Sequence, residues 1–204
     1  VIPRSKVIGI GKNYHDHAAE MGGEAPAEPL MFLIPNTAVV GPGDPVVMPP
    51  QSHNVHYEGE LAVVIGRMCK DVDPEDAASV IFGYTCANDV TARDLQRSDG
   101  QWSRAKGFDT FCPLGPWIET DLDPAAQHVI TRLDGEVVQD GSTADMVHGV
   151  AALIAHASAA FTLLPGDVIL TGTPAGVGPV QPCERVEVDI SVIGTVVNPI
   201  RRRD

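Results

Sequence analysis

The sequence predicts an α+β protein that is mainly β, with antiparallel or mixed sheets, one long helix and a few short ones. Short apolar segments bounded by Gly, Pro, Asn or Asp recur along the chain, as is typical of strands. Hairpin patterns surround Asp134-Gly135 and Gly194, and one long stretch, residues 147–163, places apolar side chains at helical spacing. Strand candidates therefore outnumber helix candidates.

The N-terminal part begins with short strand candidates, at residues 6–11, 30–40 and 46–48. A Pro- and Gly-containing turn at 42–45 separates the last two. We expect these segments to pair within one sheet system.

Residues 12–30 lie between the first two strand candidates. His17 and Glu20 are three residues apart, so a helical turn would place both on one face, and Gly22 and Gly23 would end that turn. A segment bounded in this way by Gly and Pro can act as a mobile lid. A solvated helical turn with incidental charges explains the same pattern.

The stretch HYEGELAVVIG, residues 56–66, is the strand around which we expect the chain to be organised. Side chains in a strand alternate between faces, so Glu58 and Glu60 would share one face with Ala62 and Val64. The remainder of both faces is apolar, which predicts a strand covered on both sides. Carboxylates at its end then require a neutralising positive charge, and a hard divalent cation is the simplest candidate.

The middle of the chain continues with a short helix at 74–80, which has Pro74 at its first position, and a buried strand at 81–89. This strand would deliver Asp89 at its C-terminal end. Residues 90–117 show no clean period but contain several aromatic residues. A long irregular segment in a compact domain, with aromatics that argue against disorder, predicts a functional loop.

The C-terminal part contains the two hairpins and the main helix. We expect a hairpin at 129–138, the helix from about 147 to 163, a strand at 167–170 that opens into a glycine-containing loop, and strands at 186–193 and 195–200 joined at Gly194. Pro165 stops the helix.

Length, composition and charge exclude several classes of protein. The chain has 204 residues with 44% hydrophobic content, enough for one domain spanning 1–204. Its 14 Lys and Arg against 27 Asp and Glu give a net charge of -13, which disfavours nucleic acid and anionic membranes as partners. No apolar run reaches the ~18 residues that span a bilayer, and the N-terminal residues lack the pattern of a signal peptide. We therefore expect a cytoplasmic protein.

The four cysteines, Cys69, Cys86, Cys112 and Cys183, are widely spaced and form no CxxC pair. This spacing favours reduced residues in the core over a zinc site or a disulfide framework.

Three carboxylates at predicted strand ends form the candidate metal site: Glu58, Glu60 and Asp89. Oxygen-only ligands favour magnesium, manganese or calcium over zinc or copper. An ExE pair by itself is also typical of a solvated strand edge, but the apolar strand behind it argues for burial. Lys106 is either a protonated group beside these carboxylates, where it could stabilise an enolate, or an ordinary surface lysine.

Six strings of this sequence resemble the fumarylacetoacetate hydrolase family, in its branch of small enzymes that act on acylpyruvates, oxaloacetate and hydroxymuconate-type diacids. The strings are GKNYHDHAAEMG, MFLIPNTAVVGPGD, HYEGELAVVIG, NDVTARDLQ, RAKGFDTFCPLGPW and ILTGTPAGVG. They follow the family's order from about Lys6 to the end of the chain, which argues against chance similarity.

The resemblance implies a role for each matching residue. The family's metal-binding carboxylates correspond to Glu58, Glu60 and Asp89, its active-site lysine to Lys106, its water-activating lid dyad to His17 and Glu20, and its substrate-facing positions to Arg93, Gln96 and Thr173. The implied fold is a mixed β-sandwich roll, and the implied assembly is a homodimer. Ile34 departs from the pattern because many relatives have a lysine there, which puts any charge contact from that strand to the lid or substrate in doubt.

The implied cofactor is Mg²⁺ or Mn²⁺, with Ca²⁺ as a substitute in crystals, and the implied partner is a small anionic 2-oxo acid. The cation and Lys106 would stabilise an enolate as the bond between C3 and C4 of the substrate breaks. Water activated by His17 and Glu20 would hydrolyse an acylpyruvate, whereas oxaloacetate would lose carbon dioxide without water.

Two alternatives stay open. A 1,3 proton shift in the same site would isomerise 5-carboxymethyl-2-hydroxymuconate-type diacids (2-hydroxyhepta-2,4-diene-1,7-dioate), although the intact dyad favours hydrolysis or decarboxylation. In another class, the carboxylates would hold a cation in a non-catalytic binding protein. Retention of His17, Glu20 and Lys106 argues against that second alternative.

Overall fold

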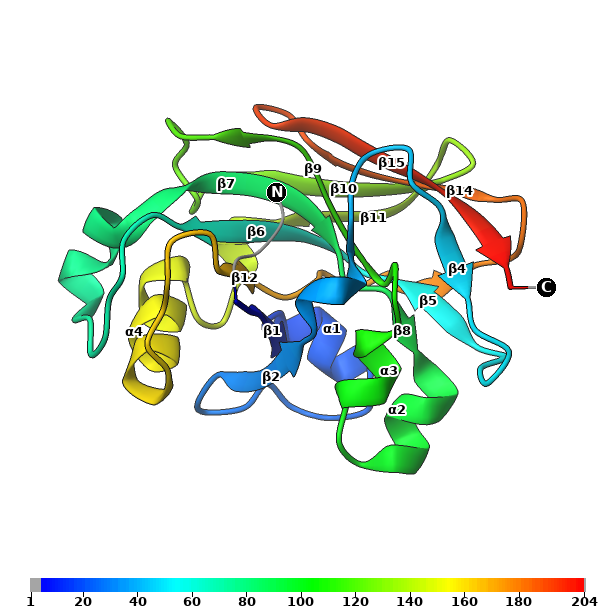
Figure 1. Ribbon diagram of the computed structural model, residues 1–204, viewed down its shortest axis with the longest axis horizontal. Coiled ribbons are helices and arrows are strands. Elements are labelled where there is room, and N and C mark those ends of the chain that lie inside the picture. The colour runs from blue at the N-terminus through cyan, green and yellow to red at the C-terminus, as the bar shows by residue number, and fades with distance from the viewer. Residues whose placement is uncertain (1–4, 204) are drawn as a thin grey trace.

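The computed structural model describes residues 5–203 and confirms a mainly β architecture with few helices (Figure 1). The strands are β1 Val7–Gly11, β2 Leu30–Ile34, β3 Val39–Val40, β4 Val46–Met48, β5 Val55–Tyr57, β6 Gly59–Ile65, β7 Ile81–Asn88, β8 Thr91–Ala92, β9 Cys112–Glu119, β10 His128–Leu133, β11 Glu136–Ser142, β12 Val168–Leu170, β13 Gly178–Pro179, β14 Arg185–Ile190 and β15 Gly194–Arg202. The α-helices are α1 His15–Glu20, α2 Arg93–Asp99, α3 Ser103–Gly107 and α4 Val150–Ala160, and the 3-10 turns are η1 Asn36–Ala38, η2 Pro74–Val80 and η3 Thr143–Asp145.

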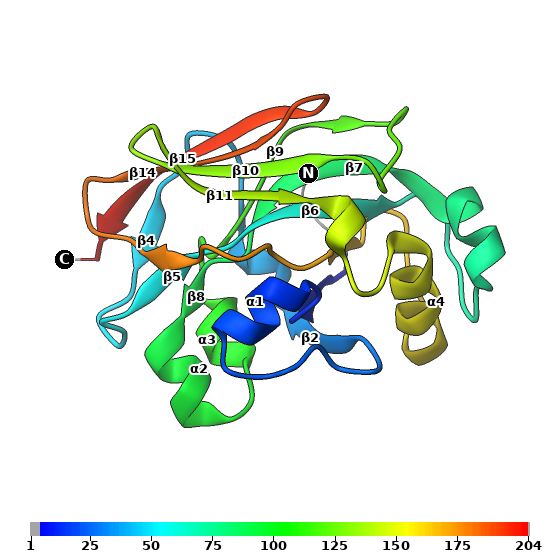
Figure 2. The same ribbon diagram turned by 180° about the vertical axis from the view of Figure 1, so that it is seen from behind.

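Two large sheets and a small one form the body of the protein. A seven-stranded mixed sheet has the order β2-β1-β12-β6-β7-β9-β3, a five-stranded sheet has the order β11-β10-β14-β15-β4, and β13, β5 and β8 form the third. The five-stranded sheet lies over β6, β7 and β9, while α1, α2 and α3 gather on the opposite side, as both views show (Figures 1 and 2). The expected mixed β roll is therefore present.

Strand β6 lies inside this structure with all seven of its residues buried, as its apolar faces predict. Leu61 and Val63 contact the apolar core that includes strand β14, whereas Ala62 and Val64 contact a second apolar cluster. Each large aliphatic side chain buried in this way contributes roughly 2 kcal/mol to folding. This burial helps to offset the cost of holding carboxylates at the end of the strand.

The two predicted hairpins are present, and the second differs in its turn. Asp134 and Gly135 both have positive φ (50° and 88°), as a type I′ turn between β10 and β11 requires. In the second hairpin the turn is residues 191–193, and Gly194 is already the first residue of β15, paired with Ile190. The reason is a hydrogen bond of 2.8 Å from Ile193 N to Ile190 O, which closes the turn one residue before Gly194.

Several element boundaries were predicted incorrectly. The strand expected over residues 56–66 is divided at Glu58 into β5, which belongs to the three-stranded sheet, and β6, which belongs to the seven-stranded sheet. Residues 30–40 form two strands rather than one, because Pro35 cannot donate to a ladder, and β2 and β3 lie at opposite edges of the sheet. Helix α4 ends at Ala160, before the predicted 163, because Leu163 pairs with Cys69 in an isolated bridge. Residues 90–117 contain α2, α3 and the start of β9. The two helices are too short to produce a visible period in the sequence.

The cysteines are all free thiols, but only Cys86 and Cys112 are buried. Cys69 is half-buried and Cys183 is exposed, so the expectation of four core residues was wrong for these two. None of the helices in the described range has the length and apolarity needed to cross a bilayer. We expect no signal peptide at the N-terminus, and residues 1–4 of that stretch lie outside the residues that the structure describes. Residue 204 also lies outside them.

Candidate metal and substrate site

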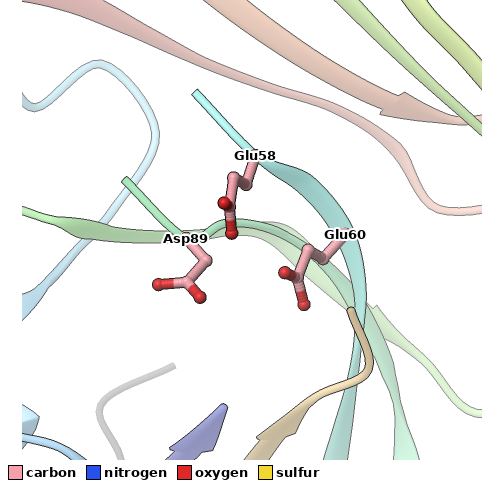
Figure 3. A group of neighbouring side chains, drawn as sticks. All are labelled: Glu58, Glu60 and Asp89. Carbon is pink, nitrogen blue, oxygen red and sulfur yellow. The ribbon is translucent and has the colours of Figure 1, made fainter. Parts of the chain in front are cut away.

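The three predicted carboxylates meet at one end of β6 and β7. Glu58 lies between β5 and β6, Glu60 lies in β6, and Asp89 follows β7 directly. One oxygen from each lies within 4.8 Å of the others, and all three residues are at most 4% exposed. Their carboxylates point into one common space (Figure 3).

Antiparallel pairing of β6 with β7 produces this convergence. Gly59 lies opposite Asn88, whose Oδ1 accepts a hydrogen bond of 2.9 Å from Glu58 N. Asp89 N donates to Glu58 O at 2.9 Å, and Gly172 N donates to Oε2 of Glu60 at 2.7 Å. Main-chain and side-chain hydrogen bonds therefore fix the positions of all three residues.

The electrostatics of the three carboxylates differ. Burial, together with the charges of Asp89 and Glu58, raises the pKa of Glu60 well above its ordinary value. Burial also raises the pKa of Asp89, even though Lys106 opposes this. Burial would raise the pKa of Glu58 as well, but Arg93 and Lys106 outweigh it and lower this pKa to about 2.

A divalent cation fits this donor set. The carboxylates supply only oxygen ligands, and Oδ1 of Asp89 is buried without a hydrogen-bond partner in the described part of the chain. Two carboxylates have raised pKa values, so the site lacks positive charge. A hard cation such as magnesium or manganese would supply both a partner for the oxygen and the missing charge.

Lys106, in α3, lies against this group and is not a surface residue. Its Nζ donates to Oδ2 of Asp89 at 2.6 Å, to Oε2 of Glu58 at 2.8 Å and to Oγ1 of Thr91 at 2.8 Å. Burial would lower the pKa of Lys106, but Asp89 and Glu58 raise it above its ordinary value. The lysine therefore stays protonated, as the first of the two sequence alternatives states.

Arg93 and Gln96 lie on one face of α2. Arg93 is 3% exposed, forms an ion pair with Glu58 through Nη2, and donates from Nη1 to Oε1 of Gln96 at 2.9 Å. Both residues line a cavity of about 190 Å³ beside the carboxylates, and their contact with substrate stays a prediction.

His17 and Glu20 share one face of α1, as their spacing predicts. Nδ1 of His17 lies 3.3 Å from Oε2 of Glu20. His17 is 5% exposed and lines the cavity, whereas Glu20 is exposed and also accepts from Gly176 N at 3.3 Å. Whether residues 12–30 act as a lid stays a prediction.

Thr173 is placed differently from the other predicted substrate contacts. It is 2% exposed, and its Oγ1 donates to Gly59 O at 2.9 Å and accepts from Nε2 of Gln139 at 2.8 Å. In this arrangement the hydroxyl holds the strand that carries the carboxylates, and Thr173 is not among the residues that line the 190 Å³ cavity. Ile34 is 1% exposed and packs in an apolar cluster with Val64, an environment that suits an uncharged side chain.

Sequence reasoning did not single out several residues that build the site. Gln139, in β11, accepts from Gly59 N at 3.0 Å and donates to Thr173 Oγ1 and to Pro174 O at 2.8 Å each. The cavity wall also contains four residues for which the sequence predicted no role, Lys12, Met21, Arg97 and Trp102, although Lys12 and Met21 lie within the string GKNYHDHAAEMG. The positive φ of Lys12 (57°) is visible only in three dimensions.

Together, the fold and the site define a β-rich protein with a candidate divalent-metal centre next to a small cavity. The family model "Fumarylacetoacetate (FAA) hydrolase C-terminal" matches residues 6–201, and the chain belongs to this family. The resemblance inferred from the six sequence strings is therefore confirmed.

Relatives with assigned activities cover the whole chain. A crystal structure of 5-carboxymethyl-2-hydroxymuconate delta-isomerase from Mycobacterium smegmatis is 56% identical, with a TM-score of 0.94, over 100% of this chain and 81% of that one. The human mitochondrial oxaloacetate tautomerase FAHD2A is 45% identical over 96% of this chain and 66% of its own length. Maleylpyruvate hydrolase from Sphingobium, solved with manganese(II) and pyruvate, is 38% identical, with a TM-score of 0.85, over 100% of this chain and 72% of that one.

Proposed function

We propose that this chain catalyses divalent-metal-dependent cleavage of a C–C bond in a 2,4-dioxo acid or a 2-oxo diacid, as acylpyruvate hydrolysis, oxaloacetate decarboxylation or both. The observation that carries this proposal is the contact of Lys106 with Asp89 and Glu58 inside a buried group of three carboxylates. A cation site with a fixed ammonium beside it suits a reaction that develops negative charge on oxygen.

Glu58, Glu60 and Asp89 would hold Mg²⁺ or Mn²⁺. The bound ion would supply a Lewis acid that polarises the 2-oxo acid group. The similar maleylpyruvate hydrolase, with its manganese and pyruvate, supports this choice of ion. Arg93 and Gln96 line the same cavity and would orient the substrate carboxylate, while the positive charge of Lys106 would stabilise the enolate oxygen.

His17 would act as the general base of the hydrolysis. Glu20 accepts from Nδ1–H, so Nε2 carries the free lone pair and would take a proton from water. The resulting hydroxide adds to the C4 carbonyl, the C3–C4 bond breaks, and its electron pair forms the enolate of pyruvate. The proton on Nε2 then returns to C3, which leaves pyruvate and a carboxylic acid.

Decarboxylation needs no water. Oxaloacetate carries a carboxylate at C4, so carbon dioxide leaves when the same C3–C4 bond breaks, and the electron pair of that bond forms the enolate, which takes a proton from solvent at C3 to give pyruvate. Lys106 would serve both reactions, whereas His17 would serve only the hydrolysis.

A second candidate is isomerisation or decarboxylation of 5-carboxymethyl-2-hydroxymuconate-type diacids. Similarity to the Mycobacterium smegmatis isomerase and to the human oxaloacetate tautomerase favours it. Nε2 of His17 would then carry a proton from one carbon or oxygen of the substrate to another. A non-catalytic cation-binding protein is the alternative from another class.

Steady-state assays with Mn²⁺ on acetylpyruvate, oxaloacetate and 5-carboxymethyl-2-hydroxymuconate separate these candidates. We expect turnover of at least one of the first two, loss of all turnover in Glu58→Ala, and loss of hydrolysis with retained decarboxylation in His17→Ala. The exposed residues Glu136 and His128 supply matched controls as Glu136→Ala and His128→Ala. Turnover of the third substrate alone favours the isomerase, no turnover at all favours the binding protein, and full activity in Glu58→Ala refutes the metal mechanism.

We also propose, from the family resemblance, that the chain forms a homodimer in the cytoplasm and acts on a small anionic substrate. Sedimentation velocity of the purified protein tests the assembly, and a mass of one chain would contradict it. Fractionation of the source cells tests the location.

A further inference from the structure

The cavity beside the carboxylates concentrates positive charge. Four of the chain's 14 Lys and Arg residues line a space of about 190 Å³, although the protein as a whole carries a net charge of -13. They are Lys12, Arg93, Arg97 and Lys106. Their concentration in one small cavity of an acidic protein indicates an anionic occupant.

The four basic residues divide into an inner and an outer pair. The inner pair is neutralised within the protein, because Arg93 contacts Glu58 and Lys106 contacts both Glu58 and Asp89. The outer pair, Lys12 and Arg97, has no carboxylate oxygen within 4.0 Å in residues 5–203. The outer charges are therefore available to a ligand.

The backbone directs both outer residues to the same cavity. Lys12 follows β1 with φ 57°, a conformation that costs a non-glycine residue free energy, and a Cβ at Gly23 would lie 3.1 Å from its Nζ. Its ammonium thus lies against the loop after α1 and lines the same cavity as α2 residues. Arg97 is one helical turn beyond Arg93 and so continues the same face of α2 towards the surface.

We infer that Lys12 and Arg97 form a second anion-binding site that recognises a carboxylate at the far end of the substrate. This inference rests on the proposed function, in which Arg93, Lys106 and the cation bind the 2-oxo acid end. A guanidinium and an ammonium that line the same cavity suit a carboxylate bound by both. The cavity volume of about 190 Å³ limits the ligand to a short chain, so the ligand that this pair would select is a short-chain 2-oxo acid with a second carboxylate.

Binding of a matched ligand pair to the Mn²⁺-loaded protein tests this site without turnover. The two ligands are 2-oxoglutarate and 2-oxopentanoate, which differ in that the first ends in a carboxylate and the second in a methyl group. By calorimetry, we expect wild-type protein to bind 2-oxoglutarate at least tenfold more tightly. Lys12→Gln and Arg97→Gln should each reduce this preference, and the double variant should abolish it while 2-oxopentanoate affinity stays within twofold.

Two further variants sharpen the test. Arg97→Lys should restore part of the preference, because it keeps the positive charge. Arg104→Gln should keep all of it, because Arg104 is an exposed residue that pairs with Asp99 and does not line the cavity. Equal affinity for both ligands in wild-type protein, or a preference that survives in the double variant, overturns this inference alone. Failure of Mn²⁺-loaded protein to bind either ligand overturns the proposed function and this inference with it.

Discussion

Nζ of Lys106 lies 2.6 Å from Oδ2 of Asp89, and both groups are buried. The lysine thereby places a fixed positive charge beside a carboxylate whose other oxygen, Oδ1, has no hydrogen-bond partner in the described residues. Asp89 thus has one oxygen bound to the protein and one available to a cation. Lys106 and a bound cation would therefore both contact the carboxylate of Asp89, one at each oxygen.

Lys106→Met tests whether the lysine and a cation interact with the same carboxylate. The variant should bind Mn²⁺ at least about tenfold more tightly, because a nearby like charge that opposes the cation has been removed. Turnover should fall by about 100-fold or more, because the enolate loses a stabilising positive charge. Mn²⁺ titration and steady-state kinetics on one preparation measure both effects. Wild-type turnover in the variant would show that Lys106 takes no part in the reaction. Weaker Mn²⁺ binding would show that Lys106 supports the cation site structurally.

Gln139 links the five-stranded sheet to the start of β6, the strand that carries Glu60 and directly follows Glu58. Gln139→Leu leaves Gly59 N and Pro174 O without their buried partner, so we expect a loss of about 3 kcal/mol in the free energy of unfolding. Mn²⁺ affinity should fall as well, because the strand loses an anchor. Urea denaturation measures the first effect. Val137→Leu, at an exposed position of the same strand, is the control, and equal stability of both variants would contradict the role of Gln139.

The part of the site that lies on one strand could be predicted from the sequence. The period of two placed Glu58 and Glu60 on one face of a single strand that is buried on both sides. The structure confirms the burial of β6, which carries Glu60, but Glu58 lies just before this strand, in the break between β5 and β6. Asp89 was predicted as a residue at a strand end, but its distance from Glu58 depends on the pairing of β6 with β7. Lys106 was left between two alternatives because α3 is five residues long and shows no period.

The remaining features depend on long-range packing. Gln139 reaches Gly59 only because the two sheets stack, and the two residues are 80 positions apart in the chain. Lys12 lies within one of the six strings and Arg97 lies within none, and only the folded cavity brings the two together. Pro35 could have indicated that residues 30–40 are divided, since proline interrupts a ladder, but not that the two resulting strands lie at opposite edges of the sheet.

Asp167 provides a pH-dependent contribution to stability away from the site. Its side chain is fully buried and pairs with Lys6. Burial would raise the pKa of Asp167, but hydrogen bonds from Lys6 and Ser5 hold it below its ordinary value. Since the folded-state pKa is lower than the unfolded one, about 3.9, this stabilisation is present above that pH and is lost as the pH falls through the folded value.

Asp167→Asn should therefore destabilise the protein by about 3 kcal/mol at pH 7, and the difference from wild type should shrink below about pH 4. Urea denaturation between pH 3 and 7 measures it, with the exposed Asp76→Asn as control. A difference that stays constant across this range would show that the charge of Asp167 does not contribute.

The proposed chemistry depends above all on Glu58, Glu60 and Asp89 holding one divalent cation. Titration of chelator-treated protein with Mn²⁺, followed by the electron paramagnetic resonance of the free ion, tests it most directly. Wild-type protein and Asp99→Asn, at a residue paired with Arg104 outside the site, should bind one Mn²⁺ per chain, and Asp89→Asn should bind at least 100-fold more weakly. Equal Mn²⁺ affinity in Asp89→Asn and wild type, or no stoichiometric binding by wild type, would contradict the claim.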